Sequence, residues 1–176
     1  MIIQLSDTLI RKGDARTYSC EFGFDDISWM REKHRLTDKK PAVLRIENTG
    51  NGHYQLHAEI DCNLHLPCDR CLKDVVCPIH ITDERELITR PTEAETMEDG
   101  LDDAYIQGYE LDVDEFIRSE LFLHIPMKVL CKEDCKGLCP KCGADLNKGA
   151  CGCLDGPLDP RMAAIQDIFR ESKSEE

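Results

Sequence analysis

The sequence predicts an α+β protein with a mainly antiparallel β part, followed by a helix, a cysteine-rich lobe and a C-terminal helix. Three observations lead to this prediction. Apolar and polar side chains alternate in several segments of the first 90 residues, which is the period of half-buried strands. After an acidic stretch, the apolar residues recur at helical spacing and no longer alternate with polar ones. Six of the eleven cysteines then fall between Cys131 and Cys153.

The β part is predicted from short apolar or alternating segments. They are residues 1–5, 17–24, 41–47, 53–66 and 75–89. The third and fourth segments flank the sequence NTGNG, whose Asn and Gly residues tolerate positive φ and favour a hairpin turn. Pro78 in the last segment indicates an edge strand or a bulge, because proline cannot donate a ladder hydrogen bond.

The first helix is predicted within residues 111–126. Asp112 is its candidate N-cap, and Glu115 stands three residues later, as in a capping box. Pro126 follows as a stop signal. The apolar positions with helical spacing are Val113, Phe116, Ile117 and Leu121.

The second helix is predicted within residues 159–172, with Asp159 as the cap and Pro160 in the first turn. Its apolar stripe consists of Met162, Ile165, Ile168 and Phe169. The chain is therefore expected to comprise a β part at 1–90, an acidic connecting loop at 91–104, and a C-terminal part at 105–176. The β part and the C-terminal part can share one core.

The chain is acidic, with a net charge of −13, and most of this charge lies in one segment. Residues 83–120 hold fourteen Asp or Glu and three Arg, a net of −11 (3 − 14). This charge argues against a surface that binds polyanions throughout. The segment is interpreted as a solvated linker or as a patch for a basic partner.

No stretch approaches the roughly 20 apolar residues of a membrane span, and the first residues do not resemble a signal peptide. The chain is therefore expected to be cytoplasmic, where thiols stay reduced. Eleven cysteines in that compartment indicate metal or thiol chemistry.

Eight cysteines form close pairs, the arrangement that delivers four soft ligands to a zinc ion. The pairs are Cys68 with Cys71, Cys131 with Cys135, Cys139 with Cys142, and Cys151 with Cys153. In LCPKCG, Gly143 follows the second thiol, as in a zinc knuckle. A redox dithiol is less suitable, because no helix pattern begins at the motif.

Two allocations of the ligands remain open. In the first, Cys139, Cys142, Cys151 and Cys153 bind one ion, and the other two pairs bind a second. In the other, every ligand lies within residues 131–153, a single ion is bound, and the first pair consists of ordinary turn residues. The prediction is thus one or two zinc ions per chain.

The sequence does not indicate an enzyme. It contains neither a phosphate-binding loop nor a nucleophile elbow nor a dinucleotide fingerprint. A zinc ion held by four thiolates has no position left for an activated water. No small-molecule substrate is evident, and the metal is expected to serve the structure.

The sequence resembles the YceD-like family, also called the large ribosomal RNA subunit accumulation family. The resemblance rests on LPCDRCL, on the block GYELDVDEFIRSELFLHIPMKVLCKEDCKGLCPKCGADLNKGACGC and on DPRMAAIQDI. It carries over to all six cysteines of the block and to Cys68, Arg70, Cys71, Asp159, Pro160 and Arg161. The family is bacterial, with plastid relatives, and its genes often lie beside that of ribosomal protein L32.

The resemblance implies a non-enzymatic factor in ribosome assembly that supports accumulation of the large-subunit ribosomal RNA (rRNA). Its expected partners are rRNA, a basic ribosomal protein of the large subunit such as L32, or both. The candidate contact residues are Arg70, Lys132, Lys136, Lys141 and Lys148. The alternative is a protein-only adaptor or holdase for a basic client, without RNA contact.

Overall fold

A computed structural model of the chain describes residues 1–89 and 105–153. These residues form two compact units. Of the described residues, the first unit comprises 1–66, 76–89 and 105–127, and the second comprises 67–75 and 128–153. No helix in the described ranges is long and apolar enough to cross a bilayer.

The strands and helices follow one another in a simple order. They are β1 (Ile2–Gln4), α1 (Leu5–Thr8), β2 (Ala15–Cys20), β3 (Asp26–Trp29), β4 (Glu32–Thr37), β5 (Ala42–Gly50), β6 (His53–Pro67), β7 (Asp74–Ile88), β8 (Ile106–Gln107), β9 (Glu110–Asp112) and α3 (Val113–Leu123). A six-stranded sheet has the order β2-β5-β6-β4-β3, with β7 paired to β6, and a small sheet has the order β1-β9-β8. The predicted α+β class with a mainly antiparallel sheet is confirmed.

The hairpin of β5 and β6 forms where the sequence predicts it. Its register runs from Val43 opposite Glu59 to Asn48 opposite Tyr54. In the turn, φ is 58° at Asn51 and 85° at Gly52. Positive φ at both central residues matches the twist of the strands and favours the Asn-Gly pair found here.

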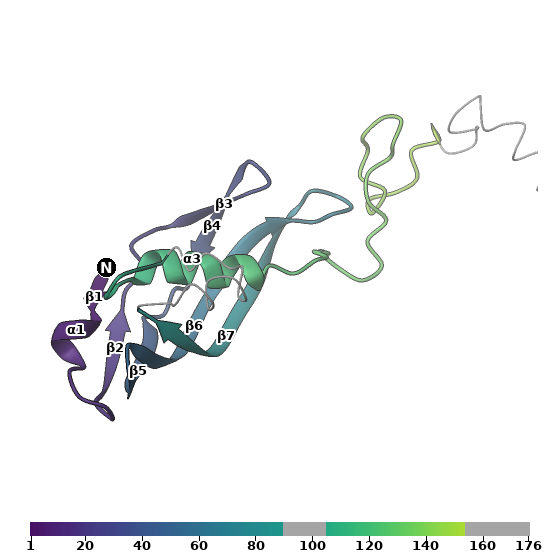
Figure 1. Ribbon diagram of the computed structural model, residues 1–176. Helices are drawn as coiled ribbons and strands as arrows, with labels where there is room; N and C mark the ends of the chain where they lie inside the picture. The colour runs from purple at the N-terminus through teal and green to yellow at the C-terminus, as the bar shows by residue number, and fades with distance from the viewer. Residues whose placement is uncertain (90–104, 154–176) are drawn as a thin grey trace, which may run out of the picture. The chain divides into compact units, whose positions relative to one another are not determined.

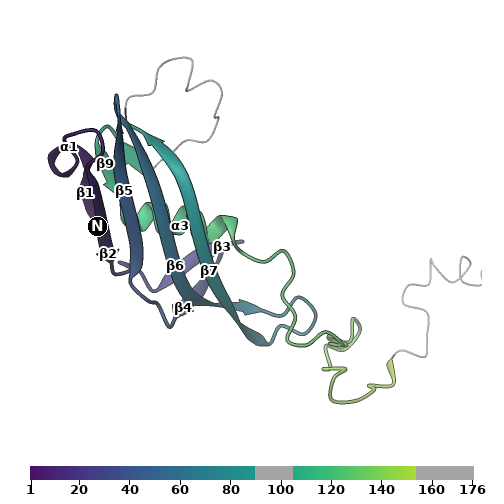
Figure 2. The same ribbon diagram turned by 90° about the horizontal axis from the view of Figure 1, so that it is seen from below.

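Helix α3 lies against one face of the main sheet, as Figures 1 and 2 show. All four predicted apolar positions of α3 are buried. Phe116 is fully buried and meets Tyr105 edge to face, with ring centroids 5.3 Å apart. Arg118 stacks over Phe24 at 3.9 Å from the ring centroid. The hydrophobic core of the first unit therefore lies between α3 and the sheet.

Of the two hydrogen-bonding halves of the predicted capping box, only the N-cap half forms at the start of α3. The Asp112 carboxylate accepts hydrogen bonds from the backbone N–H groups of Asp114 and Glu115, as an N-cap does. A capping box also needs the third residue of the helix to accept from the cap's own N–H. The N–H of Asp112 instead donates to the carbonyl of Tyr105, at 2.8 Å.

Other elements differ from the prediction or lie outside the described residues. The second predicted segment is a strand only as far as Cys20, although Phe22 and Phe24 are buried. Strands β3 and β4 and helix α1 were not predicted. The predicted helix at 159–172, with Asp159, Pro160 and Arg161, lies outside the described residues. So does the connecting loop, and the boundaries at 90 and 105 stay a prediction.

Candidate metal centres

Four cysteines from two distant parts of the sequence meet in the second unit. Cys68 and Cys71 come from the turn between β6 and β7, and Cys131 and Cys135 come from the chain after α3. The Sγ atoms of Cys71 and Cys131 are 3.5 Å apart, and those of Cys68 and Cys135 are 3.9 Å apart. All four sulfurs lie within 4.8 Å of one another. We call these four residues the hairpin group.

Backbone hydrogen bonds shape the turn that carries the first two thiols. The N–H of Cys68 donates to the carbonyl of Lys73 at 2.8 Å, and the N–H of Leu72 donates to the carbonyl of Cys68 at 2.9 Å. Asp69 ties this turn to the later segment, because it exchanges two hydrogen bonds with the backbone of Val129, at 2.9 and 2.7 Å. Both halves of the hairpin group are therefore held in place by the chain itself.

Gly137 allows the two segments to approach closely. The N–H of Leu138 donates to the carbonyl of Arg70 at 3.1 Å. A Cβ at position 137 would lie 2.9 Å from the same carbonyl oxygen, and φ of Gly137 is 77°. The Arg70 guanidinium donates to the carbonyl of Cys135 at 2.7 Å. Arg70 thus has a structural contact within the hairpin group.

The thiols of the hairpin group ionise unequally. Burial opposes ionisation of Cys68, but the N–H groups of Arg70, Cys131 and Cys71 lower the pKa of this thiol to about 6. The hydrogen bond with Cys71, followed by burial, raises the pKa of Cys131 to about 12. Such a split arises because, within a hydrogen-bonded cluster of thiols, the donating thiol keeps its proton while the accepting sulfur ionises. A divalent cation among the four sulfurs would replace these protons and favour four thiolates.

The other four paired cysteines form a second group, which we call the loop group: Cys139, Cys142, Cys151 and Cys153. Their sulfurs also lie within 4.8 Å of one another. The N–H of Gly143, where φ is 72°, donates to the carbonyl of Cys139 at 2.8 Å, which closes the tight turn expected of a knuckle. N–H groups of Cys142 and Lys141 lower the pKa of Cys139 to about 7. The thiol of Cys142 contributes most to raising the pKa of Cys153 to about 11.

Both groups suit a tetrahedral ion. Zinc–sulfur bonds of about 2.3 Å place the sulfurs of a tetrahedron about 3.8 Å apart. In the hairpin group, the Cys71–Cys131 and Cys68–Cys135 sulfur separations of 3.5 and 3.9 Å fall on either side of this value. All eleven cysteines are free of disulfide bonds. The eight thiols are grouped as the hypothesis of two ions expects, and each group can hold a metal ion.

The predicted contact lysines are exposed. They are Lys132, Lys136, Lys141 and Lys148. Lys132 forms a weak surface pair with Asp134 at 3.5 Å. These lysines are exposed to solvent, whereas the Arg70 guanidinium donates to the carbonyl of Cys135.

Three further residues of the second unit were missed by the sequence analysis. Asp145 pairs with Lys73 at 3.2 Å and accepts hydrogen bonds from the N–H and side-chain amide of Asn147, at 3.0 and 2.8 Å. The two hydrogen bonds from Asn147 contribute most to lowering the pKa of Asp145 to about 2. Asn147 also donates to Cys135 Sγ at 3.5 Å. An Asp-x-Asn turn between the two cysteine pairs was the available signal.

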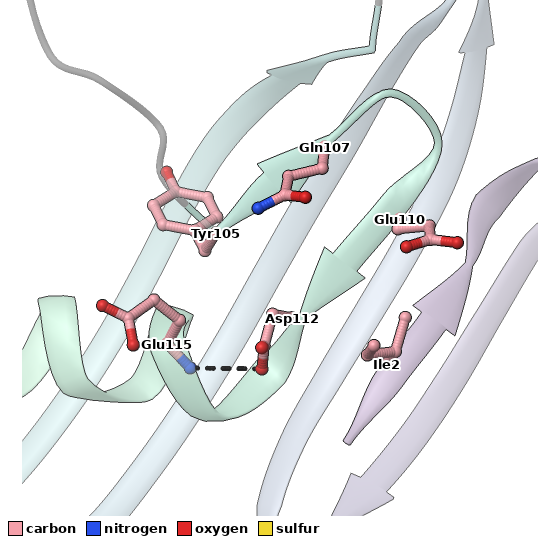
Figure 3. Close-up of a pocket in the computed structure, with 6 residues that line it drawn as sticks. All are labelled: Ile2, Tyr105, Gln107, Glu110, Asp112 and Glu115. Atoms are coloured by element: carbon pink, nitrogen blue, oxygen red, sulfur yellow. Dashed lines mark hydrogen bonds between the residues drawn. The ribbon is translucent and has the colours of Figure 1, made fainter.

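A pocket of about 360 Å³ lies in the first unit, beside the start of α3. Figure 3 shows its lining of Ile2, Tyr105, Gln107, Glu110, Asp112 and Glu115. Two of the three carboxylates already have partners: Asp112 caps α3, and Glu110 accepts from the Gln4 amide. The Tyr105 hydroxyl accepts from Arg85 at 3.0 Å. Three of the six lining residues carry carboxylates, so the lining is acidic.

A family model matches most of the chain. Residues 56–169, which include both cysteine groups, match the family model described as "Large ribosomal RNA subunit accumulation protein YceD". The chain belongs to the YceD family. The matched region covers 114 of the 176 residues (169 − 56 + 1), so the family assignment rests on most of the chain.

Curated relatives extend the YceD match. The uncharacterized protein YlbN of Bacillus subtilis (strain 168) is 32% identical over 108 residues, which is 60% of each chain. The chloroplastic YCED homolog 1 of Arabidopsis thaliana, named for large ribosomal RNA subunit accumulation, is 46% identical over 67 residues. That alignment covers 38% of this chain and 21% of the plant protein. The chain thus matches between a fifth and three fifths of the lengths of these relatives. No solved structure is similar to it.

Proposed function

We propose that this YceD-family chain is a non-enzymatic, zinc-binding factor that supports accumulation of the large-subunit rRNA during ribosome assembly. The observation that carries the proposal is the pair of cysteine groups in a chain whose family is named for this rRNA. Four thiolates around one zinc leave no ligand position for water or substrate, which favours a structural ion over a catalytic one. Among the described residues of the second unit, the buried cluster consists of cysteines with only Val75, Leu130 and Leu138 packed against it, so the ions would hold this part of the unit together.

The second unit supplies the surface for rRNA in this proposal. Residues 67–75 and 128–153 carry seven Lys or Arg and five Asp or Glu, a net of +2 (7 − 5). Two zinc ions with four thiolates each contribute −2 apiece, so the sum becomes −2 (2 − 4). With two ions bound, the described part of the second unit therefore carries no net positive charge. Contact with phosphates would depend on the four predicted contact lysines individually, which limits the RNA affinity of the chain alone.

The acidic surface of the first unit is the complementary part of the proposal. The net charge of the whole chain is −13, and three carboxylates line the pocket of Figure 3. A basic ribosomal protein of the large subunit would be attracted to such a surface. The resemblance of the sequence makes ribosomal protein L32 the first candidate to test.

The charge also favours one alternative function, a protein-only adaptor or holdase for a basic client. Cross-linking in cells, followed by purification with and without ribonuclease, separates the two functions. Recovery of large-subunit rRNA cross-linked to the chain supports the assembly factor. A set of protein partners that ribonuclease leaves unchanged, with no cross-linked RNA, supports the adaptor instead.

The lysines can be tested with a matched control. Replacing Lys132, Lys136, Lys141 and Lys148 together by Ser should reduce the slope of log affinity against log salt for an rRNA fragment, by about 0.7–0.9 for each lost phosphate contact. The control replaces Lys33 and Lys40 of the first unit, whose side chains are 75% and 73% exposed. Equal slopes in the two variants would exclude the lysines from rRNA contact.

A further inference from the structure

The polypeptide that closes the loop group also contacts the hairpin group. Asp145 and Asn147 lie in sequence between Cys142 and Cys151, two members of the loop group. The Asn147 side chain nevertheless donates to Sγ of Cys135, at 3.5 Å. Its carbonyl oxygen accepts from the N–H of Lys136 at 2.9 Å. The Asn147 side-chain amide thus forms hydrogen bonds with both the Cys135 sulfur and the peptide N–H that follows Cys135.

Asp145 orients this amide and links it to the turn that carries Cys68. Its Oδ1 accepts from the backbone and the side chain of Asn147, and its Oδ2 pairs with the Lys73 ammonium at 3.2 Å. The carbonyl of Lys73 in turn accepts from the N–H of Cys68. The Asp145 side chain is only 14% exposed, so solvent competes little for these contacts.

The backbone of the same loop is registered against the chain that follows Cys135. Leu138 and Asp145 form an isolated antiparallel bridge. The N–H of Leu146 donates to the carbonyl of Gly137 at 3.0 Å, and the N–H of Cys139 donates to the carbonyl of Ala144 at 2.8 Å. Residues 145–147 are therefore hydrogen-bonded to the same stretch of backbone that carries Cys139 of the loop group.

We propose that Asn147 and Asp145 are positioning residues that couple the two cysteine groups, so that an ion in the loop group strengthens metal binding in the hairpin group. An ion that closes the loop group orders residues 145–147 and presents the Asn147 N–H to Cys135. A hydrogen bond from an outer residue to a metal-bound ligand fixes its orientation and its electron donation, and its loss typically costs 10–100-fold in metal affinity. Linkage makes the effect reciprocal. The inference rests on the metal binding of the proposed function.

The test uses the full chain titrated with cobalt(II) and zinc against a chromophoric chelator. Asn147→Ala should weaken metal binding in the hairpin group by about 10–100-fold. It should also move the sulfur-to-cobalt charge-transfer band of that group to lower energy, since a thiolate without its hydrogen bond donates electrons more readily. A residue that only supports the fold would not shift this band. Lys148→Ala, at an exposed neighbouring position, is the matched control and should change neither quantity.

Coupling itself is measured by removing the second ion. Cys142→Ser/Cys153→Ser should lower the metal affinity of the hairpin group by about tenfold. When the same two substitutions are added to Asn147→Ala, the further loss of affinity should be much smaller. Asp145→Asn removes the charge pair with Lys73 at nearly constant volume and provides a second, milder variant, expected to weaken the hairpin group in the same direction.

Two results are decisive and distinguishable. Hairpin-group affinities within twofold of the unaltered chain in both Asn147→Ala and Cys142→Ser/Cys153→Ser would overturn the coupling while leaving metal binding intact. Absence of metal uptake by either group in the unaltered chain would overturn the proposed metal binding, and the coupling with it.

Discussion

A buried ion pair between β7 and α3 allows a quantitative test of the first unit. The Glu120 side chain is 1% exposed, and its Oε1 accepts from the Arg85 guanidinium at 2.5 Å. Within the described part of the chain, its Oε2 is buried without a hydrogen-bond partner. Arg85 also pairs with Asp83 and donates to the Tyr105 hydroxyl. Glu120 therefore depends on Arg85 more than Arg85 depends on Glu120.

Arg85→Met leaves the Glu120 carboxylate buried and without its counter-charge. Breaking a buried pair in this way costs about 3–5 kcal/mol of unfolding free energy. The double variant Arg85→Met/Glu120→Leu removes the stranded charge and fills the same space with apolar atoms. It should be more stable than Arg85→Met alone, by about 2 kcal/mol or more.

The pH dependence has a definite sign. Burial raises the pKa of Glu120 above its ordinary value of 4.5, against the opposing effect of Arg85. The folded chain then holds this proton at a pH where the unfolded chain has released it, so the contribution of Glu120 to stability falls as pH rises above 4.5. Loss of Arg85 raises the pKa further. The penalty of Arg85→Met should therefore be larger at pH 8 than at pH 5.

Urea unfolding followed by the fluorescence of Trp29, the single tryptophan, measures these free energies in the first unit. Arg45→Met is the matched control, because Arg45 is 61% exposed and lies 3.7 Å from Glu47 on the same sheet. It should cost less than about 1 kcal/mol. A cost of Arg85→Met equal to that of the control, without dependence on pH, would show that the Arg85–Glu120 pair does not stabilise the first unit.

Three further outcomes are expected. Asp112→Ala removes the N-cap of α3 and should lower the unfolding free energy by about 1 kcal/mol in the same assay. Gly137→Ala places a Cβ against the Arg70 carbonyl at positive φ and should weaken metal binding of the hairpin group in chelator competition; unchanged affinity would show that this close approach is dispensable. Chelation of the metal should speed amide exchange in residues 128–153 and leave that of β5 and β6 unchanged; equal acceleration in both would argue against independent units.

Periodicity predicted the elements with the largest buried faces. β5 and β6 alternate over many residues around an Asn-Gly turn, and α3 has its four apolar positions and its cap in the sequence. β3 and β4 were missed because each is short and presents few apolar side chains, such as Ile27 and Leu36. In strands of only four and six residues, the alternation of apolar and polar side chains is too short to indicate a strand.

The observed cysteine groups are one of the two allocations that the sequence left open. Six thiols are close in sequence, and Cys68 and Cys71 are the one remaining close pair, but spacing alone could not show that this pair joins Cys131 and Cys135. Asp145 and Asn147 were not predicted, since polar residues in a loop carry no periodic signal and their contacts with Lys73 and Cys135 are tertiary. The burial of Glu120 had a weak signal in the sequence, because Glu120 is the single acidic residue among the buried positions of α3.

In the proposed function, paired thiols hold two ions that stiffen the second unit. Native mass spectrometry combined with elemental analysis counts the metal ions bound to the purified chain. Two zinc ions per chain are expected, and one in Cys68→Ser/Cys71→Ser. A chain that carries one zinc, unchanged by this double substitution, or none, would disprove the proposal of two ions.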